Sequence, residues 1–222
     1  MAYGAQDCLL VIDVQNDFMP GGALAVPCGD EVVSVVNRLA SAFEHVVLTQ
    51  DWHPAGHASF AASHAGATPF QTIMLPYGEQ VLWPEHCVQD THGAALHADL
   101  HVPHARLLIR KGHHAGVDSY SAFVEADRTT RTGLAGYLRE HGVRRVVCVG
   151  LATDFCVAWS ALDARAAGFD AVVVEDACRA IDLDGSLDRA WRALADAGVE
   201  RTTSEALLSA AAHPHNPWLP ES

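Results

Sequence analysis

Two kinds of hydrophobic pattern alternate along this chain. Short, nearly continuous apolar runs are typical of parallel strands that are covered on both faces. Between them lie longer stretches in which apolar residues recur every three or four positions, the period of an amphipathic helix. This alternation predicts an α/β fold with three layers, α/β/α, around a central and mainly parallel sheet. The predicted strands are residues 8–14, 45–50, 106–110, 145–149, 170–174 and 199–202.

The first predicted helix shows the helical period most clearly. Asp30 can cap this helix at its start, and the pattern carries it to about Glu44. Several later helices end at a glycine, which is common just past a helix C-terminus. The buried face of the first helix is marked by Val32, Val36, Leu39 and Phe43. The predicted helices are residues 30–44, 132–141, 156–167, 186–197 and 204–212.

Two segments lack either pattern. Residues 58–81 are rich in Gly, Pro and small residues, and a loop of this length is usually a functional cover or a binding loop. Residues 213–222 have the character of a tail. No repeat and no linker-like stretch divides the chain, so we expect a single domain over residues 1–222.

Chemically useful side chains stand where four of the predicted strands end. Asp13, Asp51 and Lys111 lie at or just past the ends of three strands, and Cys156 follows the turn after a fourth. In open parallel sheets, ligands bind in the crevice outside the carboxyl ends of the strands. These side chains are therefore expected to converge on one edge of the sheet.

Composition limits the classes of protein to which the chain can belong. Half of its 222 residues are apolar and 18% are charged, as in a globular domain. The net charge of −13 argues against binding to nucleic acid or to an anionic membrane, since both need basic patches. No basic segment precedes the first apolar run, and no apolar run is long enough to span a bilayer. With six cysteines and no CxxC pair, we expect a reduced, cytoplasmic protein.

Cys156 is the candidate nucleophile. It follows a sharp turn and opens a helix, where the helix dipole is expected to lower the pKa of the thiol. A cysteine nucleophile needs a base and a cation. Asp13 can serve as the base, and Lys111 is expected to keep Asp13 ionised and to lower the thiol pKa further. The competing interpretation is a buried cysteine beside an unrelated ion pair.

Asp51 and His53 form a candidate metal site. Two residues apart on an extended segment, they can face the same side, and both are ordinary ligands of zinc, iron or manganese. His57 and His86 are both candidates for a third ligand. A carboxylate and two imidazoles would leave coordination positions open, as a functional metal site requires. Because the chain has fourteen histidines, chance pairs are expected, and we interpret as surface or loop residues His64, His92, His97, His101, His104, His113 and His114.

Two further features have a functional and an ordinary interpretation. The turn at residues 150–156 can point backbone N–H groups at an oxyanion, or it can be a plain strand-to-helix turn capped by Thr153 or Asp154. Large aromatic residues can wall a pocket for an aromatic ligand, or they can pack in the core. The aromatic candidates are Phe18, Trp83 and Tyr120.

Several separated motifs resemble the isochorismatase-like cysteine hydrolases, and within them the nicotinamidases. The resemblance extends from Leu10 to about Asp176, and the order of the motifs makes it specific. It implies the isochorismatase-like hydrolase fold. The motifs are residues 11–18 (VIDVQNDF), 20–24 (PGGAL), 50–54 (QDWHP), 83–88 (WPEHCV), 111–112 (KG), 118–123 (DSYSAF) and 150–157 (GLATDFCV).

The resemblance assigns roles to residues of this chain. It implies a catalytic triad of Asp13, Lys111 and Cys156. It implies an oxyanion hole made by the N–H groups of Ala152 and Cys156, after a cis peptide bond between Leu151 and Ala152. It implies metal ligation by Asp51, His53 and His86. The residues implied to hold the pyridine ring are Phe18, Leu24, Trp83 and Tyr120.

Three positions near these motifs need comment. Since the resemblance makes His86 the third metal ligand, His57 becomes a loop histidine near the site. Ser59 is implied, more loosely, to contact a metal-bound water. Ala122 stands where many relatives have glycine, and we expect this departure to be harmless.

The activity implied is hydrolysis of nicotinamide to nicotinate and ammonia through a Cys156 thioester. A divalent ion, with zinc favoured over iron or manganese, would anchor the pyridine nitrogen. Pyrazinamide is implied as a further substrate, and a homo-oligomer is left open because relatives vary. One alternative is a metal-free amidase acting on ureido or carbamoyl compounds. Another is a thiol redox sensor in which Cys87 would be the resolving cysteine for Cys156.

Overall fold

A six-stranded sheet forms the centre of the computed structural model, which describes residues 3–212; the predicted tail at 213–222 lies outside this range. The strand order is β5-β2-β1-β6-β7-β8. Every neighbouring pair is parallel. The strands are β1 Tyr3–Ile12, β2 Phe43–Asp51, β5 Leu107–Lys111, β6 Arg145–Leu151, β7 Asp170–Arg179 and β8 Glu200–Thr202.

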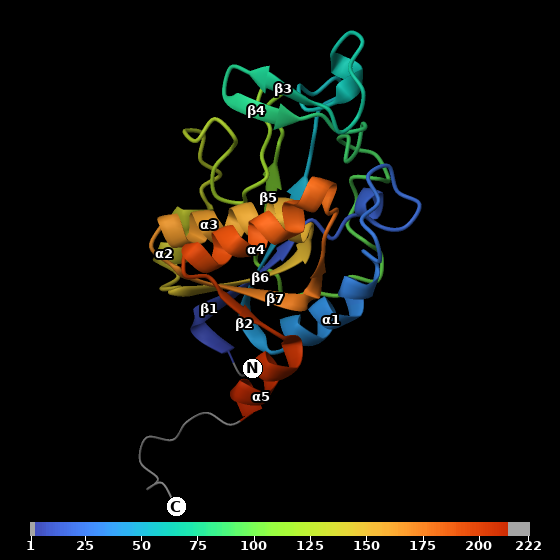
Figure 1. The fold of residues 1–222 in the computed structure, drawn as a ribbon. Helices are drawn as coiled ribbons and strands as arrows, with labels where there is room; N and C mark the ends of the chain where they lie inside the picture. Colours follow the sequence, from blue (N-terminus) through green and yellow to red (C-terminus); the bar gives the residue numbers. More distant parts are fainter. Residues whose placement is uncertain (1–2, 213–222) are drawn as a thin grey trace, which may run out of the picture.

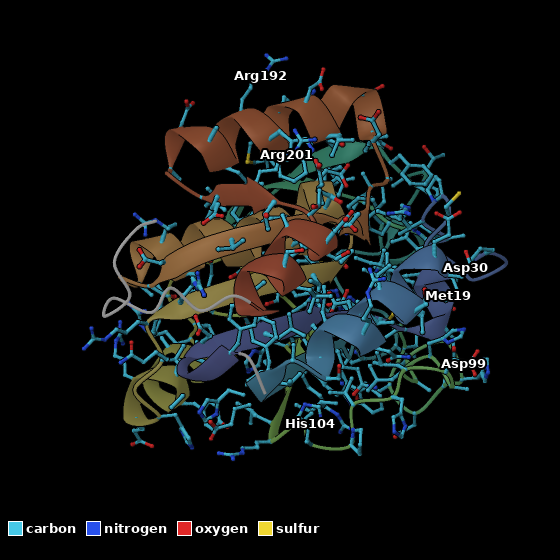
Figure 2. The ribbon with its side chains drawn as sticks, turned by 90° about the horizontal axis from the view of Figure 1, so that it is seen from below. Met19, Asp30, Asp99, His104, Arg192 and Arg201 are labelled. Carbon is cyan, nitrogen blue, oxygen red and sulfur yellow. The ribbon has the colours of Figure 1, made fainter. Side chains whose placement is uncertain are left out.

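Helices cover both faces of this sheet, which confirms the predicted three-layer α/β/α fold. In Figure 1, α1 and α5 lie on one side of the sheet, and α2, α3 and α4 lie on the other. Figure 2 views the same arrangement from below, with Asp30 beside α1 and Arg192 projecting from α4 at the far side of the sheet. The helices are α1 Glu31–Ala40, α2 Leu134–Glu140, α3 Ala158–Ala166, α4 Ser186–Asp196 and α5 Ser204–Ala212.

The central strands explain why the apolar runs are continuous. Side chains alternate between the two faces of a strand, so a strand between two helical layers must be apolar at every position. In β1, Leu9 and Val11 pack in the cluster beneath α1. Cys8 and Leu10 pack in the opposite cluster, which includes residues of α2, α3 and α4. All four are nearly or fully buried.

The first helix begins after Asp30, as predicted, but it ends earlier than the predicted Glu44. The helix stops at Ala40, and Phe43 begins β2, where its ring stacks on Tyr3 with centroids 4.4 Å apart. A buried Phe43 fits the apolar pattern whether it lies in a helix or in a strand. The helical period therefore continued past the true end of the helix. Asp30 precedes the helix but makes no side-chain hydrogen bond as a cap.

The segment expected to be a plain loop contains a β-hairpin. Strands β3 Thr72–Leu75 and β4 Gly78–Val81 pair antiparallel in a separate two-stranded sheet. In Figure 1 this hairpin stands at the top, well away from the central sheet. Its four-residue strands are too short to give a strand signal in the sequence. The loop prediction for 58–81 is therefore wrong in this part.

The carboxyl ends of the strands lie at one edge of the sheet. β2 ends at Asp51 and β5 at Lys111, and these two residues are paired in the register. β1 ends at Ile12, which pairs with Gly150 of β6. The polar residues that follow these ends therefore meet in space. Within residues 3–212, none of the helices has both the length and the apolar character needed to cross a membrane.

Candidate active site

A tight turn after β6 carries the candidate nucleophile. Gly150 has a φ of +116°, and a Cβ at this position would lie 2.0 Å from the carbonyl oxygen of Ile12. The peptide bond between Leu151 and Ala152 is cis, as the resemblance implies. Cys156 follows in a π-helical turn over Thr153–Val157, and its thiol is buried. Only glycine fits the close approach between the turn and β1, so the sequence fixes this geometry.

Thr153 and Asp154, the candidate capping residues of this turn, do not cap the helix that follows it. Neither Thr153 nor Asp154 makes a side-chain hydrogen bond as an N-cap, so the capping interpretation is wrong. The Asp154 carboxylate instead accepts hydrogen bonds from the backbone N–H groups of Ile181 and Asp182, and from the hydroxyl of Ser186. Asp154 therefore ties the nucleophile turn to the loop after β7.

Lys111 lies at the centre of the buried polar cluster. Its ammonium is fully buried and lies 2.7 Å from Oδ2 of Asp13. It also forms an ion pair with Asp51 and donates to the carbonyl oxygen of Ser119 at 3.0 Å. The Sγ atom of Cys156 lies 3.3 Å from Nζ. The structure thus brings together Asp13, Lys111 and Cys156, the three residues of the predicted triad.

Asp13 is held by the neighbouring strand. Thr49 of β2 donates its hydroxyl to Oδ1 at 2.6 Å and accepts the Asp13 backbone N–H at 3.2 Å. Oδ2 faces Lys111, and no further hydrogen bond reaches it from residues 3–212. The candidate ligand atoms of Asp13, Asp51 and Cys156 all lie within 4.8 Å of one another. One carboxylate oxygen is therefore fixed and the other is available beside the thiol.

Burial overturns the expected electrostatics of the triad. Burial raises the pKa of the Cys156 thiol well above its ordinary value, and the Lys111 ammonium only partly opposes this shift. Burial, together with the Asp51 carboxylate, also raises the pKa of Asp13 despite Lys111. The net pKa of the thiol is therefore raised and not lowered as the sequence suggested, because burial outweighs Lys111. A protonated resting thiol needs a base, and a carboxyl group with a raised pKa suits that task.

The predicted metal ligands form a second cluster beside the first. The Nε2 atoms of His53 and His86 lie 3.7 Å and 3.8 Å from Oδ2 of Asp51. Nδ1 of His53 lies 2.9 Å from the carbonyl oxygen of Gly112, and Nδ1 of His86 lies 2.8 Å from that of Pro84. A carbonyl accepts only from N–H, so each Nδ1 carries the proton and each Nε2 keeps its lone pair.

These donors suit a borderline divalent ion. All three residues are buried, and their candidate ligand atoms lie within 4.8 Å of one another. Burial would raise the pKa of Asp51, but the Lys111 ammonium opposes this shift, and that pKa lies well below its ordinary value. An ionised carboxylate and two imidazoles with free Nε2 atoms match a metal site that keeps positions open. The residues present therefore fit the implied metal.

A buried amide fixes the position of Asp51. The Gln15 side chain accepts the Asp51 backbone N–H at 2.8 Å and donates to the Asp51 carbonyl at 2.9 Å. It also donates to the carbonyl of Ala94. Gln15 belongs to the first sequence motif, but its role as a clamp on β2 was not predicted.

His57 and Ser59 bind each other. Nδ1 of His57 lies 2.7 Å from Oγ of Ser59 and accepts the Ser59 backbone N–H at 3.2 Å. Nε2 of His57 lies 3.1 Å from the carbonyl oxygens of both His114 and Val117. With both ring nitrogens engaged, His57 has no lone pair left for a metal. Its assignment as a loop histidine near the site agrees with this geometry.

A cavity with an empty volume of about 330 Å³ opens onto both clusters. All four predicted ring-binding residues line it, and Ala152 and Cys156 form part of its wall. Three further residues, Asp118, Phe155 and Ile181, were not predicted to line it. The predicted residues on its wall are Phe18, Leu24, Trp83 and Tyr120.

Hydrogen bonds hold the aromatic wall of the cavity. Nε1 of Trp83 donates to the Tyr120 hydroxyl at 3.0 Å, and Phe155 packs edge-to-face on Trp83 with centroids 4.9 Å apart. Gln80 of the hairpin donates to both Tyr120 and Asp118. The hairpin absent from our prediction therefore supports one wall of the cavity.

Comparison with known proteins agrees with this site. The isochorismatase domain family matches residues 7–206, and the chain belongs to this family. A nicotinamidase of Acinetobacter baylyi is 56% identical over 205 residues, covering 92% of this chain and 96% of the relative. The resemblance inferred from the motifs is therefore confirmed.

Solved structures extend the comparison. A nicotinamidase and pyrazinamidase of Acinetobacter baumanii has a TM-score of 0.91 at 59% identity, covering 91% of this chain and 98% of that one. A pyrazinamidase of Pyrococcus horikoshii in complex with zinc has a TM-score of 0.73 at 34% identity, covering 89% and 99%. The zinc complex and the donor cluster together support a divalent metal in this chain.

Proposed function

We propose that this chain hydrolyses nicotinamide to nicotinate and ammonia. The observation that carries the proposal is that the thiol of Cys156 and the donors Asp51, His53 and His86 line one cavity with an aromatic wall. Relatives named nicotinamidase, at up to 59% identity over nearly the whole chain, support it. We place the activity in a single domain, because the polar residues of the site come from strands of one sheet and the loops after them.

The metal ligands in this proposal are Asp51, His53 and His86, and zinc is the favoured ion, as in the Pyrococcus horikoshii relative. When bound, a divalent ion supplies a positive charge that can accept the lone pair of the pyridine nitrogen. Phe18, Leu24, Trp83 and Tyr120 then form the walls around the ring. These contacts place the carboxamide beside Cys156.

Asp13 and Cys156 carry the covalent chemistry. Asp13 takes the thiol proton through Oδ2, and Sγ attacks the amide carbon. The N–H groups of Ala152 and Cys156 receive the oxyanion, and an oxyanion-hole donor is typically worth about 3–4 kcal/mol of barrier. Asp13 returns the proton to the nitrogen, ammonia leaves, and a thioester remains. Water that gives a proton to Asp13 then attacks the thioester, releasing nicotinate and the thiol.

Lys111 balances charge through these steps. It contacts Asp13 and Cys156, between which the proton moves. Because Lys111 is fully buried, its ammonium stays beside both groups whether the proton is on Asp13 or on Cys156. Pyrazinamide, which has a similar ring and amide, is proposed as a second substrate. A cytoplasmic location is proposed for the protein.

The alternative functions fit the geometry less well. A metal-free amidase for ureido or carbamoyl compounds has no use for the cluster of Asp51, His53 and His86. A thiol sensor needs reactive thiols, whereas burial raises the pKa of both Cys87 and Cys156 well above the ordinary value. Both cysteines are free thiols in the structure.

Ammonia release from nicotinamide tests the proposal. Purified protein should release ammonia, lose this activity after a strong chelator, and regain it on return of zinc. Cys156→Ser should lose at least about a thousandfold in rate, whereas the exposed Cys28→Ser should match the wild type. Normal turnover by Cys156→Ser would refute the covalent mechanism. Full activity after proven metal removal would refute the role of the metal.

A further inference from the structure

A second group of metal-type donors lies outside the cavity. His113 and His114 follow the end of β5, and Glu125 comes from a later loop. Their candidate ligand atoms all lie within 4.8 Å of one another. The two histidines are exposed, whereas Glu125 is 2% exposed. The chain thus holds a buried carboxylate with two solvent-accessible imidazoles beside it.

The backbone around Glu125 is fixed. Its N–H donates to the carbonyl of Thr130 at 2.8 Å, and its carbonyl accepts from Arg128 at 2.9 Å. The next residue, Ala126, donates its N–H to the carbonyl of Asp118 at 2.8 Å. These bonds set the carboxylate opposite the histidines before any ligand arrives. Preorganisation of this kind lowers the cost of ordering a site.

Distances in the group are close to those of a metal site. Nδ1 of His114 lies 2.9 Å from both carboxylate oxygens of Glu125. In a tetrahedral zinc site, bonds of about 2.0–2.1 Å place neighbouring ligand atoms about 3.3 Å apart. If the exposed His114 side chain moved by a few tenths of an ångström, an ion could take the place of the proton between Nδ1 and the Glu125 carboxylate. The ring centroids of His113 and His114 lie 4.0 Å apart, so His113 places a second imidazole beside the same carboxylate.

We propose that His113, His114 and Glu125 form a second divalent metal site that binds zinc or a chemically similar ion. Two imidazoles and one carboxylate are the donor set that such borderline ions prefer. Exposure of both histidines leaves the remaining positions to water. The site is therefore expected to be open and to exchange its ion more readily than the buried cluster.

The same segment supports the active site. The carbonyl of Gly112 accepts from Nδ1 of His53, and the carbonyl of His114 lies 3.1 Å from Nε2 of His57. The rings of His53 and His57 are in contact, with centroids 4.4 Å apart. An ion on His113 and His114 would hold the segment from which these carbonyls come. Occupancy of the outer site is thus expected to steady the orientation of an inner metal ligand.

Zinc stoichiometry tests this proposal on the full chain. Chelator-stripped protein is dialysed against a series of zinc concentrations. The number of bound zinc ions per chain is then measured by elemental mass spectrometry. The wild type should take up a second equivalent after the first. Glu125→Gln keeps the shape of the carboxylate side chain and should lose the second equivalent while keeping the first. His113→Ala should do the same, and it leaves the His114–Glu125 contact in place.

Other histidines provide the controls. His101→Ala removes an exposed histidine whose backbone N–H donates to Asn37 of α1, and His213→Ala/His215→Ala removes two that lie outside the described residues. Both control proteins should still bind the second equivalent. The proposal is overturned if the wild type binds only one equivalent, if Glu125→Gln and His113→Ala both keep the second, or if a control loses it.

Discussion

Asp51 and Lys111 are paired residues of β2 and β5, and an ion pair joins their side chains. Asp51 also faces the Nε2 atoms of His53 and His86, and Lys111 also contacts Cys156. The proposed metal site and the proposed nucleophile therefore share one buried network. A change at either member of the pair is expected to disturb both.

Asp51→Asn should weaken zinc binding by at least about a hundredfold, because the neutral amide is a poor ligand and loses the charge that balances the metal. Ammonia release from nicotinamide should fall in parallel. Zinc affinity and turnover are measured on the same preparations. Asp90→Asn, at an exposed loop position, is the matched control. Retention of wild-type affinity by Asp51→Asn would remove this residue from the proposed site.

Lys111→Met should lower the free energy of unfolding by roughly 3–5 kcal/mol, because it leaves the buried carboxylates Asp13 and Asp51 without their cation. Urea unfolding measures the change. Arg106→Met breaks an ion pair with Glu44 whose side chains are about half exposed, so it should cost less than about 1 kcal/mol. Similar losses in the two variants would contradict the importance assigned to burial.

Thr49→Val should slow turnover without changing KM greatly. The variant removes the hydroxyl that orients Asp13 at 2.6 Å, and a hydrogen bond to a charged group contributes about 1.5–3 kcal/mol. That range corresponds to roughly a 10- to 100-fold lower kcat. Thr49→Ser, which keeps the hydroxyl, should recover most of the loss. A variant that raises KM alone would indicate that Thr49 acts on binding and not on the base.

Gly150→Ala should fail to give active, stable protein, because the new Cβ would meet the Ile12 carbonyl at 2.0 Å. Gly136 is the contrast, since it lies within α2 and a Cβ there meets no atom within 4 Å beyond its chain neighbours and its own helix backbone. Gly136→Ala should therefore stabilise the chain by roughly 0.5–1 kcal/mol. Thermal unfolding compares the pair. A soluble, active Gly150→Ala protein would show that the turn tolerates a side chain.

Stability should fall in alkaline solution because of the buried thiols, among them Cys8 and Cys178. Burial raises the pKa of Cys8 and of Cys178 from 9.0 to about 12. Below pH 9 both states keep these protons and the full stability is present. Between pH 9 and about 12 the unfolded chain loses its protons first, so each thiol lowers the unfolding free energy by roughly 1 kcal/mol per pH unit.

Urea unfolding across this pH range tests the assignment. The double variant Cys8→Ala/Cys178→Ala should start from lower stability because it leaves cavities, but its stability should fall less steeply with pH. The exposed Cys28→Ala should keep the wild-type slope. Equal slopes in the wild type and the double variant would show that other groups cause the alkaline loss.

Much of the fold and of the site follows from sequence because both depend on the strands. Continuous apolar runs located the central strands, and their ends located Asp13, Asp51 and Lys111. The hairpin at 72–81 was missed because four-residue strands carry too few positions for a period to show. Ile181 was missed because its place depends on the contact between Asp154 and the loop after β7.

Electrostatics could not be predicted in the same way. The pKa of Cys156 depends on how completely its neighbours exclude water, and that is a property of packing. A helix end and a lysine are visible in the sequence, whereas the burial that outweighs them is not. The same holds for His113 and His114, whose carboxylate partner Glu125 comes from a separate loop.

Register links folding to activity in this protein. Asp51 faces Lys111 only while β2 and β5 keep their pairing, and a slip of one residue would turn either side chain toward the opposite helical layer. Such a slip would separate Lys111 from Asp51 and from Cys156 together. A misaligned chain would therefore lose zinc affinity and turnover in one event. During refolding, we expect metal uptake and catalytic activity to return with the same time course.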